Sequence, residues 1–444
     1  MKNNRILALI LTLCMMFGLM QFPASATAPI FTATATSPTV YADALYTYAA
    51  ISDGIDDEGY TVYYTEIPAE ITFAESEHYA NSLTDYQKGI YRAAMDILCD
   101  IDSDALAVKQ KVIIEYTTIE PASITTQEEF NTLVNNKLNE EAPKLDIQSV
   151  YNAIQYDHTE LFWARNMTGS VGVNASYDGV DATFYWSVTL SVDASENFDS
   201  DEALILAAKD MDSAVEMIIS DAPTTGEHDL LVYFNEWLKA NNTYNNTHLE
   251  NDNYPLAHTA YSAFTSDNDE PTGPVCQGYA YALKYLCDKA GIHSVIVTGD
   301  LCQTGAAPGP HAWNAVELDG KWYAIDTTAN DSLSTDEYSF LAGSATPSHD
   351  SGYPTFSASH VNDTTHTYPT LSETAYVAVV RLPGDVNGDD IVNNKDFGIL
   401  RQYLNNWDVT INESNADVNA DGIVNNKDMG ILRQYLNNWD VELL

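Results

Sequence analysis

The stretch from 274 to 326 holds the residues best suited to nucleophilic chemistry. Small and apolar residues recur at steps of three and four from Cys276 to Ala290, which predicts a helix with Cys276 in its first turn, on the inward side. Pro274 suits the start of that helix and Gly291 its C-terminal cap. A thiol at a helix N-terminus lies at the positive end of the backbone dipole, which favours the thiolate. We therefore predict that Cys276 is a nucleophile.

An Asp-Gly pair at 319–320 predicts a hairpin that carries a histidine and an aspartate. Both central residues of a type I′ turn need positive φ, which Asp and Gly accept. Counting back from a two-residue loop places Trp313 opposite Asp326 and His311 opposite Thr328. His311 and Asp326 are then diagonal neighbours on one face, with Cα atoms roughly 7–8 Å apart. A register shift of one residue would put them on opposite faces.

Cys276, His311 and Asp326 together predict a relay for acyl transfer. Cys276 would attack, His311 would take and return the proton, and Asp326 would orient the imidazole. The backbone N–H of Cys276 would help to bind the oxyanion of the tetrahedral intermediate. Taken singly, a cysteine at a helix start is more often a buried apolar residue, and a histidine or aspartate in a hairpin more often packs or faces solvent. The ordered set of three favours catalysis.

Three motifs resemble the transglutaminase-like superfamily, whose core is papain-like. They are Val-Cys-Gln-Gly-Tyr-Ala at 275–280, His-Ala-Trp-Asn at 311–314 and Lys-Trp-Tyr-Ala-Ile-Asp-Thr-Thr at 321–328. The resemblance implies that Cys276, His311 and Asp326 are the catalytic residues. Members often have a tryptophan soon after the aspartate, where this chain has Ala329, so the wall of the substrate site departs from the family pattern.

The first residues predict export. A basic start at 1–5, an apolar run at 6–20 and small residues at 24–26 are typical of a secretory signal peptide over 1–26. An Ala/Thr-rich segment with prolines follows, and we expect a flexible linker over 27–40. No later segment has the uninterrupted apolar length needed to span a bilayer, so we expect a secreted, extracellular product without a membrane partner.

Composition excludes one class of partner. Acidic residues exceed basic ones by 64 to 19, and the net charge of −45 would repel phosphate backbones and anionic lipid surfaces. Nucleic acid is therefore not expected as a partner. The cysteines that remain after export do not fall in closely spaced pairs, and Cys287 would lie roughly 16 Å from Cys276 along the same helix, too far for a disulfide.

Residues 41–226 predict a mixed α/β N-terminal extension. Its patterns favour helices at 84–99, 127–138 and 202–220 and strands at 111–117 and 183–192, without a catalytic signature. We expect this part to pack and to place substrate. Asp157, His158 and Glu160 invite a metal site, but a turn and helix start explains them better.

Residues 227–381 predict the transglutaminase-like catalytic domain. After Asp326 the chain becomes polar and rich in loops, and a strand is expected at 374–381. His349, His360 and His366 follow at irregular spacing, which favours solvated side chains over a metal site.

The C-terminal part, 382–444, repeats itself. Segments 385–409 and 417–441 differ at three positions, and each places oxygen side chains at loop positions 1, 3, 5, 9 and 12 with a carbonyl donor at 7, the ligand spacing of an EF-hand calcium loop. Helices are expected at 398–404 and 430–436. The predicted ligands are Asp385, Asn387, Asp389, Ile391 through its carbonyl, Asn393 and Asp396, and then Asp417, Asn419, Asp421, Ile423 through its carbonyl, Asn425 and Asp428.

This loop-helix duplication resembles a type I dockerin, the module that attaches enzymes to the cohesin domains of a cellulosome scaffold. The resemblance implies two Ca²⁺ ions, a cohesin partner and cellulosome association. It also implies the cohesin-contacting positions, which are Asn394, Lys395, Arg401 and Gln402 with their twins Asn426, Lys427, Arg433 and Gln434. Calcium is expected to be needed for folding, since closely set carboxylates repel one another without a cation.

The sequence thus predicts an α+β chain: a papain-like transglutaminase core with a mixed N-terminal extension and a small all-α calcium-binding dockerin. Its function would be acyl transfer on protein or peptide amides, by hydrolysis or transamidation, without a catalytic cofactor. The alternative is a non-catalytic binding or structural subunit of the cellulosome. Direct action on polysaccharide is supported only by the usual association of dockerins with plant-polysaccharide-degrading enzymes. The sequence shows no recognisable pair of glycosidase carboxylates.

Overall fold

The computed structural model describes residues 31–36, 40–41, 52–68, 71–98, 106–165, 167–251, 254–266, 268, 270–333, 338–378 and 382–444. The chain divides into two compact units, 1–376 and 377–444. The predicted N-terminal extension and catalytic domain therefore belong to one unit. The predicted signal peptide lies outside the described residues, as does the start of the predicted linker.

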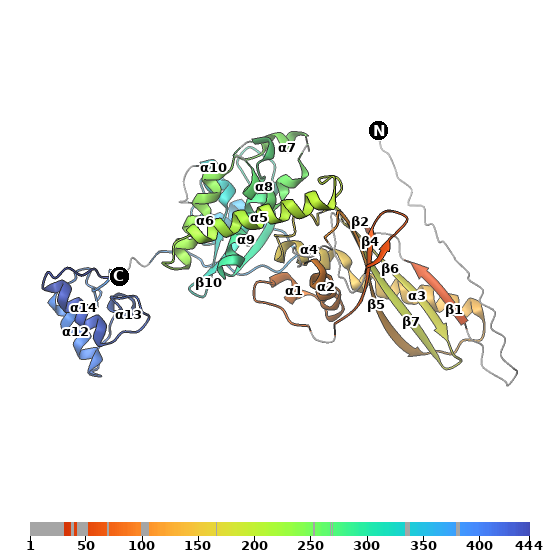
Figure 1. The fold of residues 1–444 in the computed structure, drawn as a ribbon, viewed down its shortest axis with the longest axis horizontal. Helices are drawn as coiled ribbons and strands as arrows, with labels where there is room; N and C mark the ends of the chain where they lie inside the picture. Colours follow the sequence, from red (N-terminus) through yellow and green to blue (C-terminus); the bar gives the residue numbers. More distant parts are fainter. Residues whose placement is uncertain are drawn as a thin grey trace. The chain divides into compact units, whose positions relative to one another are not determined.

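A seven-stranded sheet forms the framework of the N-terminal part (Figure 1). Its order is β1 (Phe31–Thr36), β6 (Met167–Tyr177), β7 (Asp181–Asp193), β5 (Lys109–Pro121), β4 (Thr61–Glu66) and β3 (Ser52–Ile55), with β2 (Val40–Tyr41) also on β6. β4 and β5 run parallel, and the other neighbours are antiparallel.

The prediction of an unpacked linker over 27–40 was wrong where the structure describes it. Phe31 to Thr36 pairs with Tyr177 to Gly172 of β6, and Val40–Tyr41 extends the pairing. The reason lies in the segment Phe-Thr-Ala-Thr-Ala-Thr, in which threonine alternates with small residues as strand side chains do.

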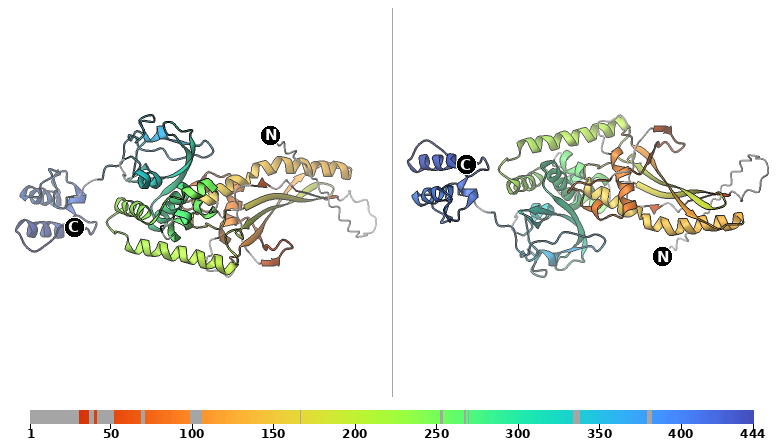
Figure 2. Two further views of the ribbon diagram at one scale, coloured as in Figure 1. Left: turned by 90° about the horizontal axis from the view of Figure 1, so that it is seen from above. Right: turned by 90° about the horizontal axis from the view of Figure 1, so that it is seen from below.

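One long helix packs on this sheet, and α4 (Ile147–Asp157) contacts β8 (Ser294–Leu301) of the second part of the unit. α3 (Gln127–Leu145) packs along β1 and β6 (Figures 1 and 2), and Thr126 and Glu129 form a capping box at its start. The other helices are α1 (His78–Ser82), α2 (Asp85–Leu98), α4 (Ile147–Asp157) and α5 (Asp201–Asp221). The helices expected at 84–99 and 202–220 are present with nearly the same ends, whereas the helix expected at 127–138 continues to Leu145.

The second part of the unit places a helix against a four-stranded antiparallel sheet. The sheet order is β10 (Lys321–Ile325), β9 (Gly309–Leu318), β8 (Ser294–Leu301) and β11 (His360–Asn362), and α9 (Cys276–Ala290) packs on β8 and β9. The surrounding elements are α6 (Glu227–Asn241), α7 (Asn246–Asn251), η1 (Pro255–His258), α8 (Ala260–Thr265), η2 (Glu270–Thr272), α10 (Thr327–Leu333) and α11 (Phe356–Ser359). The described part of the strand expected at 374–381 is irregular instead. The mixture of helices and sheets confirms the α+β class.

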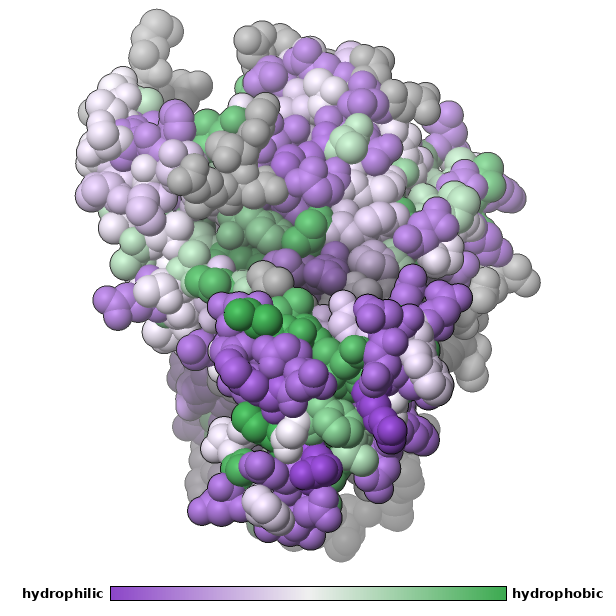
Figure 3. All heavy atoms as spheres, turned by 90° about the vertical axis from the view of Figure 1, so that its left-hand side faces the viewer, coloured by the Kyte–Doolittle hydropathy of each residue, from purple (hydrophilic) through white to green (hydrophobic). Residues whose placement is uncertain are grey.

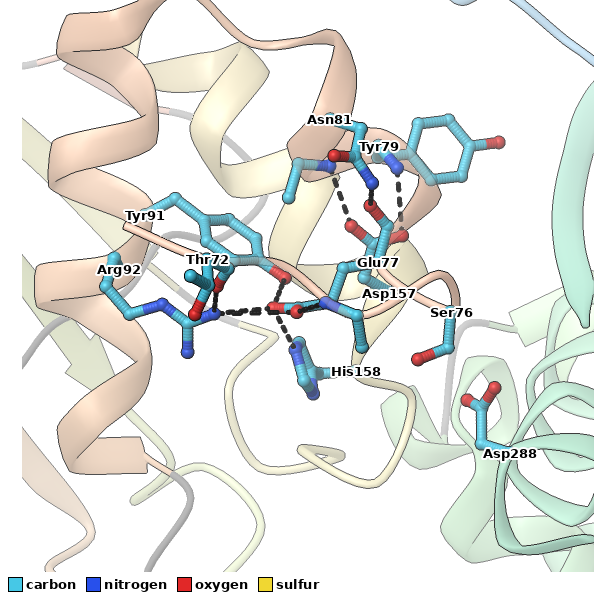
Figure 4. Close-up of polar contacts among 12 residues, drawn as sticks. Thr72, Ser76, Glu77, Tyr79, Asn81, Tyr91, Arg92, Asp157, His158 and Asp288 are labelled. Carbon is cyan, nitrogen blue, oxygen red and sulfur yellow. Dashed lines mark hydrogen bonds and ion pairs between the residues drawn. The ribbon is translucent and has the colours of Figure 1, made fainter. Parts of the chain in front are cut away.

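Figure 4 shows polar contacts around Glu77 and Asp157 in the N-terminal part, and Lys284 Nζ of α9 donates to the nearby Ser76 O at 3.4 Å. Asp157, at the end of α4, accepts hydrogen bonds from the backbone N–H groups of Tyr79 and Ala80 at 3.0 and 2.8 Å. Lys284 of α9, which is fully buried, binds Asp288 at 2.6 Å. Burial raises the pKa of Asp157 to about 7.

His158 and Glu160 pair with each other in the turn after α4. The distance from His158 Nδ1 to Glu160 Oε1 is 2.8 Å. Glu77 lies 3.6 Å from Nε2 of the same imidazole (Figure 4). The turn expected here is present, although Asp157 ends a helix where a helix start was expected. These contacts explain the three residues as structural, in agreement with the preference for that interpretation over a metal site.

The unit 377–444 is small and helical. It holds α12 (Asn394–Leu404), α13 (Glu413–Ala416) and α14 (Asn426–Leu436), packed around Val386, Leu400, Ala416, Val418 and Leu432. Among its exposed side chains, Ile391 and Trp407 have the repeat partners Ile423 and Trp439. Figure 3 shows one face of the molecule, where apolar patches lie among hydrophilic residues.

The described helices hold no candidate for a membrane-spanning segment, since none combines the necessary length with sufficient apolarity.

Candidate functional site

Helix α9 begins at Cys276 and ends at Ala290 with Gly291 as its C-terminal cap, as the sequence predicts. Gly291 has φ 75° and closes the C-terminus from the left-handed region. The segment before the helix is held by a hydrogen bond from Val275 N to Ala257 O of 2.9 Å. A Cβ added at Gly278 would lie 2.5 Å from Ala257 O, so glycine permits this close packing of η1 against the first turn.

The β9–β10 hairpin has the predicted turn. Asp319 and Gly320 have φ of 52° and 70°, and the pairing runs from Lys321↔Leu318 to Ile325↔Asn314. The predicted pairing does not continue further, because Asp326 N donates to Ser339 O at 2.8 Å. Trp313 and Asp326 are therefore not ladder partners, and Thr328 lies in α10 instead of opposite His311.

His311 and Asp326 nevertheless meet. The distance from His311 Nε2 to Asp326 Oδ2 is 2.8 Å, and both side chains are buried. Asp326 Oδ1 also accepts from Ala329 N at 3.1 Å, at the start of α10. The carboxylate is thereby fixed between a strand end and a helix start, and the proximity that the hairpin register predicts is present without the last predicted rungs.

Cys276 lies near this imidazole. The side chain of His311 and the backbone of Ala312 both lower the pKa of its thiol. With Nε2 turned to Asp326, Nδ1 is the imidazole atom left for the sulfur. The order sulfur, imidazole, carboxylate is the one needed for a nucleophile, a general base and an orienting group.

Electrostatics in this site favour the charged forms of all three groups. Burial alone would raise the pKa of Cys276, but the hydrogen bond and charge of His311 hold it below its ordinary value of 9.0. Burial opposes the charge of His311 as well, yet Asp326 raises the pKa of His311 to about 10. Against the same burial, the imidazoles keep the pKa of Asp326 below its usual 3.8. These shifts favour a thiolate–imidazolium pair.

The other described cysteines have a different environment. Cys287 and Cys302 are buried and free, and burial raises the pKa of Cys287 to about 12. Cys276 and Cys287 do not form a disulfide, as the helix geometry predicts. Cys276 is therefore the cysteine whose surroundings favour the nucleophilic form.

His360 is a site residue that the sequence interpretation missed. It was expected to be solvated, but only 7% of its surface is exposed, and its Nε2 lies 3.1 Å from the same Asp326 Oδ2 that contacts His311. Its ring stacks on Phe356 with centroids 4.0 Å apart, and Ser359 Oγ lies 2.9 Å from Nδ1. The short strand β11 positions it, which no local pattern indicates because β8 supplies the pairing.

The other two histidines of this segment differ. His349 is exposed, as expected, and contacts Tyr338. His366 is half-buried between Tyr79 and Tyr156, and burial lowers its pKa, so the expectation of a solvated side chain was wrong for it.

Tyr244 is a second residue that the sequence interpretation left without a role in the site. Burial raises the pKa of Tyr244, and Cys276 is the next largest influence on it, so the phenol lies near Cys276. Its ring lies parallel to that of Tyr279, with centroids 6.4 Å apart. The N–H predicted to bind an oxyanion therefore has a hydroxyl beside it.

A cavity of about 210 Å³ opens on the carboxylate side of this group. His311, Asp326 and His360 line it together with Ala329 and Leu333. Ala329, whose position departs from the family pattern noted in the sequence, contributes a small side chain to this wall.

His311, Asp326 and His360 are also the one group of three potential metal ligands found in the described segments, with ligand atoms within 4.8 Å of one another. Each imidazole Nε2 already makes a hydrogen bond to the shared Oδ2. These hydrogen bonds account for the arrangement without an ion.

The predicted calcium ligands lie in the two loops that precede α12 and α14. Asp396 and Asp428, at loop position 12, are fully buried at the first turns of the helices. Asp396 Oδ1 accepts from Asn387 Nδ2 at 2.8 Å, whereas the buried Oδ1 of Asp428 has no hydrogen-bond partner. An unsatisfied buried carboxylate oxygen among oxygen donors fits a hard cation such as Ca²⁺.

Two predicted ligand positions make internal hydrogen bonds in each loop. Asn393 Nδ2 donates to Ile391 O at 3.1 Å, and Asn425 Nδ2 donates to Ile423 O at 2.8 Å. Asn393 also caps α12. Calcium binding through these carbonyls would replace the amide contacts.

The remaining predicted ligands lie at the entrances of the loops. Asp385 accepts from Asp389 N at 3.1 Å, and Asp417 from Asp421 N at 3.2 Å. These bonds curl each loop around its first residue. Asn419 Oδ1 likewise accepts from Asp421 N at 2.9 Å.

The residues predicted to contact cohesin lie on the first turns and outer faces of α12 and α14. Asn394, Lys395 and Arg401 are exposed and Gln402 is half-buried, and the twins Asn426, Lys427, Arg433 and Gln434 repeat this pattern. Lys395 and Lys427 also pair with loop carboxylates, at 3.1 Å to Asp389 and 2.9 Å to Asp421.

Comparison with known proteins identifies two segments. Residues 215–327 match the model of the transglutaminase-like superfamily, and residues 383–437 match the model of the dockerin type I domain. The kyphoscoliosis peptidases of Mus musculus and Homo sapiens are 36% and 34% identical over 76 residues, which are 15% of this chain and 12% of each relative. The chain thus matches about an eighth of the length of these relatives.

Two solved structures share 14% sequence identity with the chain. One is titled as the crystal structure of a TGase and has a TM-score of 0.23, with 50% of this chain and 51% of the other covered. The other is the periplasmic domain of TgpA from Pseudomonas aeruginosa bound to ethylmercury, with a TM-score of 0.15 over 38% and 74%.

Proposed function

Since the chain carries a transglutaminase-like domain at 215–327 and a type I dockerin at 383–437, we propose that it is a secreted cysteine enzyme that transfers acyl groups from protein or peptide amides while docked to a cellulosome scaffold. One observation carries the enzymatic part. The imidazole of His311 is hydrogen-bonded to Asp326 at 2.8 Å, and the same imidazole holds down the pKa of Cys276, the first residue of α9.

The first half of the reaction forms a thioester. The thiolate of Cys276 attacks the amide carbonyl carbon, and the carbonyl oxygen becomes an oxyanion next to the backbone N–H of Cys276. The imidazolium of His311 then gives its proton to the amide nitrogen. The C–N bond breaks, the amine leaves, and Asp326 stabilises the imidazole in the tautomer that retains a proton on Nε2.

The second half resolves the thioester. Neutral His311 takes a proton from water or from an amine, whose oxygen or nitrogen attacks the thioester carbonyl. The C–S bond breaks, the acyl product leaves as a carboxylic acid or a new amide, and the thiolate of Cys276 is restored. Hydrolysis is the proposed outcome, because transamidation needs a bound amine while water is abundant outside the cell.

The dockerin supports the proposal of a scaffold partner. Its two loop-helix repeats carry oxygen donors that fit calcium, and the outer faces of α12 and α14 present the positions expected to contact cohesin. We propose that two Ca²⁺ ions hold the loops in the form that binds a cohesin domain.

Alkylation distinguishes an enzyme from a non-catalytic subunit. At pH 7, iodoacetamide should modify Cys276 faster than Cys287 and Cys302, because His311 lowers the pKa of Cys276 and burial raises that of Cys287. Peptide mapping of the modified chain measures the three rates. Equal, slow modification would favour the alternative of an adaptor on the scaffold.

A substrate screen tests the activity itself. The native chain and Cys276→Ala are incubated separately with an extracellular protein mixture, and new termini, deamidated side chains and crosslinks are compared by mass spectrometry. Cys287→Ala is the matched control, because it removes a thiol from the same helix. The proposal fails if the products of the native chain and of Cys276→Ala are the same.

A further inference from the structure

A polar cavity of about 450 Å³ lies beside the start of α9. One wall of the cavity is formed by α4, with Asn152, Gln155 and Tyr156. The other walls are formed by Arg165, His258 and Gln277 of α9. Gln277 follows Cys276 directly in the chain. The cavity therefore reaches the residue next to the proposed nucleophile.

The walls of this cavity are fixed by structure on both sides. Asn152, Gln155 and Tyr156 recur at steps of three and four and share one face of α4, while Val150 and Ile154 pack into the core. On the α9 side, Gln277 is held by two hydrogen bonds, from its Nε2 to Tyr281 Oη at 2.8 Å and between its Oε1 and His258 Nδ1 at 3.1 Å. The polar groups are therefore preorganised.

The chemistry of the lining differs from that of the chain as a whole. The cavity is lined by carboxamides, tyrosines, a threonine, His258 and Arg165, without an aspartate or glutamate, in a chain of net charge −45. Carboxamides both donate and accept hydrogen bonds, and guanidinium groups bind planar oxygen-bearing groups such as carboxylates. An anionic or amide group finds matching partners here.

We propose that this cavity binds a side chain ending in a carboxylate or carboxamide, at a position of the peptide substrate adjacent to the amide that Cys276 attacks. The inference rests on the proposed function, since it names the substrate class of the same site. Asn152, Gln155, Tyr156 and Arg165 lie outside the segment 215–327 that matches the superfamily model. The N-terminal part of the chain thus supplies specificity that the superfamily core does not contain.

Binding to a chain that cannot react tests this proposal. Full-length Cys276→Ser is titrated with three fluorescent peptides that differ at one position, which is glutamate, glutamine or lysine. Fluorescence anisotropy should show that the glutamate and glutamine peptides bind at least about tenfold more tightly than the lysine peptide, since one charge-assisted hydrogen bond has about this effect. The first two peptides distinguish the carboxylate from the carboxamide.

Variants of the cavity give the second arm. In the Cys276→Ser background, Arg165→Gln should weaken binding of the glutamate peptide about tenfold or more. Because Arg165 also donates to Pro255 O, Arg165→Gln removes a structural contact as well as a binding group. Gln155→Ala leaves that contact in place, and it should weaken binding of both the glutamate and the glutamine peptide. Lys209→Gln is the matched control, since it removes one positive charge from an exposed site on α5.

Equal binding of the three peptides, or unchanged binding in both cavity variants, would overturn the proposal. The alkylation of Cys276 in the native chain is measured separately. Slow alkylation together with selective binding would reject the enzyme and retain the cavity as a recognition site. Fast alkylation without selective binding would reject the cavity and retain the enzyme.

Discussion

Replacing His360 by phenylalanine tests how much the second imidazole that contacts Asp326 contributes to the rate of acyl transfer. The ring of His360 stacks on Phe356 at 4.0 Å, so phenylalanine keeps the volume and the stacking. It removes the hydrogen bond of 3.1 Å to Asp326 Oδ2. Asp326 then keeps the contacts with His311 at 2.8 Å and with Ala329 N at 3.1 Å.

The size of the effect follows from the type of bond lost. A hydrogen bond to a charged group contributes about 1.5–3 kcal/mol, which corresponds to a factor of roughly 10 to 150 in rate if all of it orients the transition state. The lower end is expected, because Asp326 keeps two of its three contacts. The kcat/KM of acyl transfer by His360→Phe should therefore fall about tenfold.

The pH profile separates this role from a general loss of structure. His360 helps to hold the pKa of Asp326 low, so its removal leaves a less compensated carboxylate beside His311. The pKa of His311 should then rise above its value of about 10, and the alkaline limit of turnover should move upward. His360→Gln keeps an N–H donor and should recover part of the rate.

Turnover of a substrate from the screen is measured from pH 5 to about 11 for the native chain and both variants, with melting temperatures as the control for folding. If His360→Phe has the turnover and the alkaline limit of the native chain, the hydrogen bond to Asp326 has no part in positioning the relay. A lower melting temperature with an unchanged pH profile would make His360 a packing residue.

The remaining predictions concern charge, backbone packing and the dockerin. Because His311 lowers the pKa of Cys276, alkylation of Cys276 should be fast below pH 9. Turnover should be lost as the pH rises through about 10, because His311 then gives up the proton that the leaving amine needs. Profiles of the alkylation rate and of turnover against pH check both. Tyr244→Phe removes a hydroxyl beside the N–H of Cys276 and should lower turnover about 100-fold or more if that hydroxyl helps to bind the oxyanion, while a change below twofold would exclude this role. Gly278→Ala should lower stability by about 1–3 kcal/mol in a denaturant titration, because its Cβ would lie 2.5 Å from Ala257 O. Chelation of calcium should abolish cohesin binding and reduce the helical circular dichroism of residues 382–444; binding that survives chelation would contradict the calcium requirement.

Local patterns were sufficient where neighbours in the sequence determine the geometry. The helical period and its flanking Pro274 and Gly291 predict both ends of α9, and Asp319-Gly320 predicts the hairpin turn and its register up to Ile325. The carboxamide and carboxylate spacing of the C-terminal loops is likewise complete within a dozen residues. Each of these features is stabilised mainly by hydrogen bonds between residues close in sequence.

Two strands, β6 and the segment 31–36, have an alternating sequence pattern from which they were not predicted. β6 alternates buried and partly exposed residues from Met167 to Tyr177, the period of a strand packed on one face. In the segment 31–36, threonine alternates with phenylalanine and alanine, and the segment pairs with β6 although its composition resembles a linker. Composition was the weaker guide because pairing depends on a partner strand far away in the chain.

The sequence by itself determined the chemical groups of the candidate relay, their order, and the turn that brings His311 near Asp326. Only the tertiary structure decided that Asp326 also receives His360, that Tyr244 lies against Cys276, and that α4 faces Gln277 across a polar cavity. These contacts join segments that are 32 to more than 100 residues apart. The packing of whole sheets and helices creates such contacts, and no local propensity encodes them.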